Sequence, residues 1–286
     1  MRIAVASGKG GTGKTTVSLS LAAYLAMKGN HVTYVDCDVE EPNGHLFLHP
    51  SIEHTKSVTI PIPVVDLTRC DRCGKCAEIC RFSAIVVISE KVLIFPELCK
   101  GCGGCSLVCP TDAIQEAPRA TGVVESGQAV GMKYIAGRLN IGQASAVPII
   151  REIKRILPDN ENVILDAPPG TSCPVIETIK DSDIVVLVTE PTPFGLHDLQ
   201  LASKMVQQVG IPQVIVLNRA CQSNELIYRF CRDEYIDLIA EIPDDRRAAE
   251  AYSRGEIMIR ALPESANHFG KIFRGIQHKL HKQIAV

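Results

Sequence analysis

Eight of the twelve cysteines of this 286-residue chain stand in two runs with the same spacing. CDRCGKCAEICRFSAI begins at Cys70, and CKGCGGCSLVCPTDAI begins at Cys99, 29 residues later. The runs share four cysteines, one glycine and a closing Ala-Ile, so they form an internal repeat. Each is C-x2-C-x2-C-x3-C, a spacing in which three thiolates surround one iron-sulfur cubane while the fourth reaches another. Paired zinc sites are the alternative, because C-x2-C pairs also suit zinc.

The repeat resembles a bacterial two-cluster ferredoxin over roughly residues 60–118. The resemblance implies two [4Fe-4S] clusters, with the fourth ligand exchanged between the halves of the repeat. The implied ligand sets are Cys70, Cys73, Cys76 and Cys109 for one cluster, and Cys99, Cys102, Cys105 and Cys80 for the other. One departure is Arg81 after Cys80, where the second run has Pro110 after Cys109. All eight ligands remain, so we expect this change to affect the local chain geometry and the cluster potential but not the presence of the cluster.

A second group of chemical residues forms the stretch GKGGTGKTT, from Gly8 to Thr16. It matches the phosphate-binding pattern G-x-x-x-x-G-K-[ST] and lies between an apolar, strand-like run and a helix-like segment. Backbone N–H groups of such a loop face the phosphates, Lys14 reaches the β and γ phosphates, and the Thr15 hydroxyl binds Mg²⁺. The expected phosphate-binding residues are Gly8, Lys9, Gly10, Gly11, Thr12, Gly13, Lys14, Thr15 and Thr16.

Lys9 is an additional lysine near the start of this loop. KGGTGKTT resembles the deviant Walker motif of the MinD/ParA/Mrp superfamily of ATPases, to which nitrogenase iron protein is related. The resemblance implies that Lys9 reaches a phosphate across a dimer interface, so hydrolysis would be coupled to an ATP-dependent homodimer. The alternative is a solvated surface lysine without a role.

Two further segments resemble the nucleotide switches of this superfamily. DCDVEEPN resembles the first switch, which implies that Asp38 orients the attacking water and that Asp36 lies nearer the Mg²⁺. VILDAPPGT resembles the second switch, which implies that Asp166 holds Mg²⁺ through water and that Gly170 senses the γ phosphate. The alternative for Asp166 is a cap or turn role, which is more common for an aspartate at a strand end. Its place between VIL and PPG favours the functional interpretation.

The adenine pocket is expected at two places late in the chain. Asn218 and Arg219, in VLNR, match the position where superfamily members recognise adenine. Pro243 and Asp244, in IPDD, complete the expected pocket. An asparagine that ends a strand is also common in turns, so this hypothesis depends on the resemblance.

The remaining cysteines give weaker signals. Cys173 follows the second switch, where a redox or ligand role competes with that of a small buried side chain. Cys221 and Cys231 form no C-x2-C pair, so the dimer-bridging cluster of Mrp-type scaffold ATPases is not supported. Cys37 is expected to pack beside the first switch.

The elements that must position these residues follow an alternating pattern. Near-continuous apolar runs of strand length occur at 3–7, 31–36, 162–167, 183–190 and 213–218, as expected for parallel strands buried on both faces. Helical patterns lie between most of them. We therefore expect an α/β P-loop NTPase of the MinD-like (SIMIBI) class, with a mainly parallel sheet flanked by helices.

The cysteine repeat interrupts this order. We expect the ATPase domain to span residues 1–55 and 121–286, with a small α+β ferredoxin-like domain inserted at 56–120. The last segment, from His268, is expected to be a packing helix; a membrane-surface helix is the alternative. Its apolar face would carry Phe269, Ile272, Phe273, Ile276 and Leu280.

Charge and composition limit the partners. A formal net charge of −2 and a pI near 6.5 give no basic footprint for nucleic acid. No apolar run approaches the length of a membrane span, and no signal peptide is evident. We therefore expect a cytoplasmic location and no stable membrane insertion. Twelve cysteines in a reducing compartment indicate metal or redox chemistry.

The combined hypothesis is a Mg²⁺-dependent ATPase that also carries two [4Fe-4S] clusters. Lys9, Lys14 and Asp38 are the expected catalytic residues, while Thr15, Asp36 and Asp166 serve Mg²⁺. Three functions remain open: ATP-gated electron transfer, assembly or delivery of a metallocluster, and a MinD/ParA-type positioning role with structural or sensory clusters. The redox or metallocluster partner protein is not identified by the sequence.

Overall fold

The computed structural model describes residues 1–221 and 224–284, and a nine-stranded sheet organises them. The strand order is β11-β10-β9-β1-β8-β2-β7-β6-β3. Neighbours from β11 to β7 are parallel, whereas β6 pairs antiparallel with both β7 and β3. The strands are β1 (Arg2–Ala6), β2 (Val32–Asp36), β3 (Ser51–Val65), β6 (Ile114–Ala129), β7 (Met132–Leu139), β8 (Asn162–Asp166), β9 (Ile184–Thr189), β10 (Gln213–Ala220) and β11 (Leu238–Pro243).

The five expected strands all form, as β1, β2, β8, β9 and β10, and the expected α/β fold with a mainly parallel sheet flanked by helices is confirmed. Their central positions are almost completely buried, which explains their near-continuous apolar composition. The parallel register pairs Asp36 with Asp166 at the carboxyl ends of β2 and β8. The sheet thus brings two carboxylates from distant segments to one edge.

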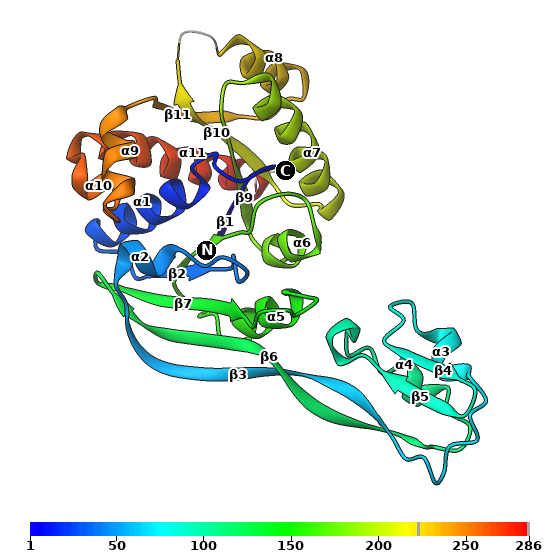
Figure 1. Ribbon diagram of the computed structural model, residues 1–286. Coiled ribbons are helices and arrows are strands. Elements are labelled where there is room, and N and C mark those ends of the chain that lie inside the picture. The colour runs from blue at the N-terminus through cyan, green and yellow to red at the C-terminus, as the bar shows by residue number, and fades with distance from the viewer. Residues whose placement is uncertain (222–223, 285–286) are drawn as a thin grey trace.

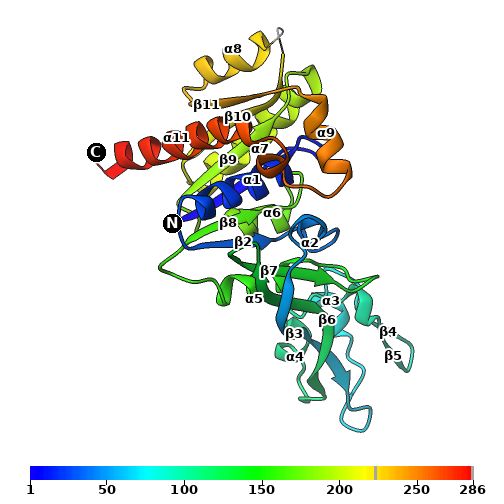
Figure 2. The same cartoon turned by 90° about the vertical axis from the view of Figure 1, so that its left-hand side faces the viewer.

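Helices cover both faces of the sheet (Figures 1 and 2). One face is covered by α1 (Lys14–Met27), α10 (Met258–Ala261) and α11 (Ala266–Ile284), with α2 (Gly44–Leu48), α9 (Arg246–Ser253) and the short η2 (Pro263–Ser265) nearby. The other face carries α5 (Val147–Arg155), α6 (Cys173–Ile179), α7 (Pro193–Val209) and α8 (Glu225–Asp233). Along β1, Ile3 and Val5 pack on the first face, while Ala4 and Ala6 pack on the second.

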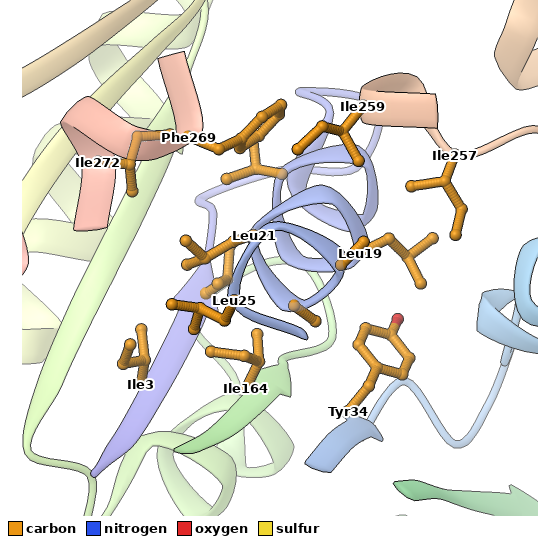
Figure 3. Packing of buried hydrophobic residues seen from close by; sticks show 14 of the residues in the cluster. Ile3, Leu19, Leu21, Leu25, Tyr34, Ile164, Ile257, Ile259, Phe269 and Ile272 are labelled. Atoms are coloured by element: carbon orange, nitrogen blue, oxygen red, sulfur yellow. The ribbon is translucent and has the colours of Figure 1, made fainter. Parts of the chain in front are cut away.

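Figure 3 shows the first of these two cores, in which α1 lies among residues from β1, β2, β8 and α11. The terminal helix contributes three side chains with no exposed surface, Phe269, Ile272 and Ile276. Phe273 and Leu280 are partly buried against the same cluster. The apolar face of α11 is therefore used in packing; residues 285–286 of the expected segment lie outside the described residues. No described helix is long and apolar enough to cross a membrane.

β3 and β6 form a long two-stranded ribbon that extends beyond the rest of the sheet (Figure 1). The expected domain boundaries, 55/56 and 120/121, fall inside these two strands, so the backbone continues in one strand across each boundary. The register shifts between Ile52 and His54 and between Val58 and Thr59. Such bulges increase the local twist of a ribbon.

The far end of the ribbon carries residues 66–113, which we call the cysteine module. It contains α3 (Lys75–Ile79), the hairpin of β4 (Ile85–Ile88) and β5 (Lys91–Ile94), η1 (Pro96–Leu98) and α4 (Gly104–Leu107). The internal repeat is visible in the backbone, because three pairs of positive φ angles occur at the same 29-residue offset. These pairs are Arg72 and Gly101 (61° and 67°), Gly74 and Gly103 (80° and 72°), and Ser83 and Asp112 (51° and 48°).

Candidate functional site: a nucleotide cleft and two cysteine cavities

The phosphate-binding loop connects β1 to α1. Gly11 and Gly13 adopt φ angles of 81° and 89°, which glycine accommodates without a steric penalty. Gly13 is the N-cap of α1 and supplies no side-chain hydrogen bond to the first helical turn. The N–H groups of that turn are therefore available to a bound anion, as the phosphate-loop prediction requires.

A cleft of about 1230 Å³ opens beside this loop. Most of the residues predicted to bind nucleotide line it together: Lys9, Gly10, Gly11, Gly13, Lys14, Thr15, Thr16, Asp38, Asn218, Arg219, Pro243 and Asp244. An open cleft of this size has room for a nucleotide, and its lining combines glycines of the loop, cations and apolar side chains such as Ile242 and Met258. The expected phosphate, switch and adenine segments thus meet at one cleft.

Five predicted residues are not among those that line the cleft. Gly8 packs against α7, where an added Cβ would overlap the backbone of Asp198. Thr12 is buried, and its carbonyl accepts a hydrogen bond from Asn218 Nδ2 at 2.8 Å. Gly170 has a φ angle of 93°, and its N–H donates to the Ser7 carbonyl at 3.0 Å, which joins the second switch to the start of the loop. The other two are Asp36 and Asp166.

Asp166 connects two buried side chains below the loop. Its Oδ1 lies 3.4 Å from Lys14 Nζ, and its Oδ2 accepts a hydrogen bond from the Tyr34 hydroxyl at 3.0 Å. Burial, together with the nearby carboxylates of Asp166 and Asp36, raises the pKa of Tyr34 well above its usual value, which keeps the phenol protonated as a donor. Asp166 is therefore fixed in orientation beside the lysine that is expected to reach the phosphates.

Asp36 binds the backbone of the first switch through hydrogen bonds. Its carboxylate accepts hydrogen bonds from the backbone N–H groups of Asp38, Asn43 and Gly44 at 3.1, 3.1 and 2.8 Å. Burial and the adjacent Asp166 raise its pKa to about 7. The expected role of Asp36 near Mg²⁺ stays a prediction, since both of its oxygens are engaged by the backbone here.

Asp38 lies at the junction of the cleft and a neighbouring cavity between the two switches. Burial raises the pKa of this carboxyl group to about 6, although Lys14 acts in the opposite direction. A carboxylate with a pKa near neutrality is suited to orient or deprotonate water.

Lys9 forms an ion pair within its own chain. Its Nζ lies 2.6 Å from Oε1 of Glu190, whose Oε2 lies 3.1 Å from Arg219 Nη1. Arg219 has a φ angle of 54°, at a point where the register between β10 and β11 shifts. This unusual backbone conformation separates the neighbouring side chains, so that Asn218 donates to the P-loop and Arg219 contacts Glu190.

The eight repeat cysteines divide between two cavities. The first, of about 320 Å³, is lined by Cys70, Cys73, Cys76 and Cys109 together with apolar side chains such as Val87 and Ile114. The second, of about 490 Å³, is lined by Cys80, Cys99, Cys102 and Cys105. These are the two ligand sets that the ferredoxin resemblance implies, including the exchange of Cys80 and Cys109.

Several thiol groups already accept hydrogen bonds from backbone amides. Ala84 N–H donates to Cys80 Sγ at 3.3 Å, Gly101 N–H to Cys99 Sγ at 3.4 Å, and Ala113 N–H to Cys109 Sγ at 3.2 Å. Burial opposes ionisation of Cys80 and Cys109, but the backbone amides outweigh it and lower the pKa of both thiols. Amide donors of this kind stabilise thiolates, the form that binds iron.

Four thiols line each cavity, a donor set that would fit a four-iron cluster. No group of three or more His, Cys, Asp or Glu side chains within residues 1–221 and 224–284 converges closely enough to hold one metal ion. A cubane separates its thiolates by the width of four irons and four sulfides, so its ligands line a cavity instead of meeting at a point.

The other four cysteines lie outside these cavities. Cys37 is buried beside the first switch, where burial and Asp36 raise its pKa far above the usual range. Cys231 is also buried, and its pKa is raised to about 11, mainly by burial. Cys173, at the start of α6, and Cys221 are exposed.

Two residues at the site were not identified from sequence. Tyr34 lies in the middle of β2, and Glu190 follows the last residue of β9; a tyrosine or a glutamate has many uses at such places. The position of Glu190 directly after a parallel strand, at the edge where ligands bind in such sheets, was the available signal.

Comparison with known proteins gives a consistent picture. The profile of the family described as "CobQ/CobB/MinD/ParA nucleotide binding domain" matches residues 3–259. An uncharacterised protein of Methanocaldococcus jannaschii is 31% identical over 264 residues, which cover 91% of this chain and 92% of that protein. An iron-sulfur cluster carrier protein of the same organism is 22% identical over 295 residues, covering 98% and 84% of the two chains.

Among solved structures, the chain is similar to the septum site-determining protein MinD from Pyrococcus horikoshii, a complex with Mg-ADP. The TM-score is 0.60, with 20% identity and coverage of 96% of this chain and 95% of that one. At this identity the likeness concerns the fold.

Proposed function

The chain belongs to the CobQ/CobB/MinD/ParA nucleotide-binding family, and from that premise we propose that it couples Mg²⁺-dependent ATP hydrolysis to electron transfer through two [4Fe-4S] clusters. The observation that carries the proposal is the direct chain connection between the two sites. The first switch leads into α2, and β3 begins at Ser51, three residues after α2 ends at Leu48. β3 then runs without interruption to the cysteine module, so a movement of the switch would act on a continuous strand.

The nucleotide part of the proposal assigns roles to residues of the cleft. Lys14 and the amides at the start of α1 would neutralise phosphate charge, while Thr15 and Asp166 would hold Mg²⁺. Asp38 would orient the attacking water. Lys9 would act on the phosphates of a second copy, which makes hydrolysis depend on a homodimer.

The cluster part assigns four cysteines to each cavity. When bound, the clusters would supply one-electron chemistry. The polypeptide would hold them through thiolates, exclude water with the apolar lining and tune their charge through the amide donors to Cys80, Cys99 and Cys109. Four ligands for each cluster are typical of resident cofactors.

A second candidate is delivery of an iron-sulfur cluster to other proteins. It is favoured by relatives described as iron-sulfur cluster carrier proteins, which are 22–25% identical over 98–99% of this chain. In that case a cluster would be cargo, and its bonds to the chain would break in each cycle.

One experiment separates these functions. Anaerobically prepared protein is subjected to two redox titrations, one in the presence of ADP and one in the presence of a non-hydrolysable ATP analogue. Electron paramagnetic resonance follows the oxidation state of the clusters. Electron transfer gated by nucleotide predicts cluster potentials that differ between the two states, because coupling between two equilibria is reciprocal. Equal potentials, together with loss of iron to an apo-ferredoxin acceptor on ATP addition, would favour delivery. Stoichiometric zinc without iron would exclude both.

A further inference from the structure

Glu190 joins two cations at the nucleotide cleft, of which Lys9 is one and Arg219 the other. The Glu190 side chain is only 12% exposed, whereas those of Lys9 and Arg219 are 33% and 54% exposed. The carboxylate is therefore the most dehydrated member of the group. Removal of a partner from a buried charge costs far more than loss of an exposed ion pair.

The position of Glu190 is fixed by its backbone. It lies between the end of β9 at Thr189 and the N-cap of α7 at Thr192, and the Thr192 N–H donates to the Glu190 carbonyl at 2.8 Å. Gly195 packs so closely that an added Cβ would overlap this carbonyl. The Glu190 backbone thus has little freedom to follow a moving cation.

The two cations differ in what they must do. In the proposed function, on which this inference rests, Lys9 leaves its own chain to reach the phosphates of a second copy. Arg219 is held by the bulged end of β10, and no part of that function requires it to leave Glu190. If Lys9 departs, Arg219 still compensates the Glu190 charge.

We infer that Glu190 is a positioning residue that retains Lys9 within its own chain in the free protein, and that Arg219 permits the release of Lys9. The two partners of Glu190 therefore have opposite effects on dimerisation. Loss of the carboxylate frees Lys9 and favours the dimer. Loss of Arg219 leaves Lys9 as the remaining cation of the group, so the free chain holds it more firmly.

The first measurement concerns Lys9 in the nucleotide-free chain. Reductive methylation followed by peptide mass spectrometry gives the labelling rate of each lysine amine. We expect Glu190→Gln to raise the Lys9 rate about fivefold and Arg219→Gln to lower it about twofold, in the range of partly exposed ion pairs. Lys279, which pairs with Asp237 elsewhere, serves as the internal control. An unchanged Lys9 rate in Glu190→Gln would overturn the inference.

The second measurement concerns association at a saturating concentration of a non-hydrolysable ATP analogue. By analytical ultracentrifugation, Glu190→Gln should lower the protein concentration for half dimerisation about fivefold, and Arg219→Gln should raise it about tenfold. In the double variant the Arg219 effect should vanish, because no carboxylate remains to be compensated. An Arg219 effect that persists in the double variant would assign Arg219 to nucleotide contact alone and contradict the inference.

The two measurements distinguish this inference from the proposed function. If Lys9 labelling changes as expected but no variant dimerises, the retention of Lys9 stands and its action across a dimer is wrong. If the wild-type chain dimerises with the ATP analogue but Lys9 labelling is the same in all variants, the proposed function stands and the role of Glu190 is wrong.

Discussion

The nucleotide cleft and the cysteine module differ in how much hydrophobic core supports them. Residues of the cleft are attached to strands and helices whose side chains fill two hydrophobic cores, one on each face of the sheet. Within the module, the buried apolar side chains are those of Ala84, Ile85 and Ala113. The cleft is therefore shaped by packing alone, whereas in the proposed function the module would depend on its clusters for cohesion.

Exposed apolar side chains of the module support this contrast. Many of the large hydrophobic residues with high exposure belong to it: Leu67, Ile79, Phe82, Ile88, Leu93, Phe95, Leu98 and Leu107. So small a segment cannot bury them all against itself.

The largest expected effect is that of cluster removal. Anaerobic treatment with an iron chelator should raise proteolysis within residues 66–113 at least about 100-fold, because metal–thiolate binding contributes on the order of 10 kcal/mol to the folding of such units. The thermal transition of the remaining chain should persist. Limited proteolysis with mass spectrometry and calorimetry measure the two effects. Cys221→Ser, outside the cavities, is the control. Unchanged protection of residues 66–113 would mean that the module is folded without its clusters.

Substitution of the two loop lysines should have the next largest effect. Lys14→Ala should weaken binding of an ATP analogue about 100-fold, since this buried amine is expected to contact the phosphates. Lys9→Ala should keep binding within about threefold but reduce hydrolysis about 100-fold. Isothermal calorimetry and phosphate release give the two quantities, with the exposed Lys204→Ala as control. Normal hydrolysis by Lys9→Ala would make Lys9 a surface charge.

A smaller effect is expected from pH. Burial raises the pKa of Asp38 to about 6, and in its proposed role the carboxylate must be ionised to act on water. The value of kcat/KM for ATP should therefore fall about tenfold for each pH unit below 6, whereas a carboxyl group with its ordinary pKa would stay active down to about pH 4. Circular dichroism at pH 5 checks that the fold is intact. If the residual kcat/KM of Asp38→Asn falls with decreasing pH in the same way, the titration belongs to another group.

The smallest effect is expected where the ribbon meets the core. Lys56 of β3 lies 2.6 Å from Glu152 of α5, but its side chain is 67% exposed. Lys56→Gln should cost at most about 1 kcal/mol of unfolding free energy in denaturant titration. Arg232→Gln, which removes an exposed pair with Glu225, gives the baseline. A loss of more than about 3 kcal/mol would mean that this contact fixes the ribbon.

The sequence predicted those parts of the fold that have a local signal. Buried parallel strands have continuous apolar runs, and the phosphate loop has its own pattern, so both were accessible. The ribbon was not predicted, because β3 is largely exposed, contains Pro61 and Pro63, and pairs with a strand some 60 residues later. Its stability comes from long-range pairing that leaves little trace in local composition.

The site shows the same division. Spacing grouped the cysteines, and resemblance indicated Lys9, Asp38 and Asp166. Glu190 and Tyr34 were missed because their roles arise from contacts with other segments of the chain, Lys9 and Asp166, and these contacts depend on strand order. Strand order is set by tertiary packing and cannot be derived from a single run of residues.

The pairing of β3 with β6 has a consequence for how the module is joined to the chain. Val65 and Ile114 face each other in the antiparallel register, and the Asp66 N–H donates to the Ala113 carbonyl at 2.8 Å. Entry and exit of the module are thus adjacent, in the place where an ordinary β-hairpin would have its turn. Residues 66–113 therefore form an insertion at the position of a hairpin turn. A two-residue turn in their place would close the hairpin and leave the strand order of the sheet unchanged.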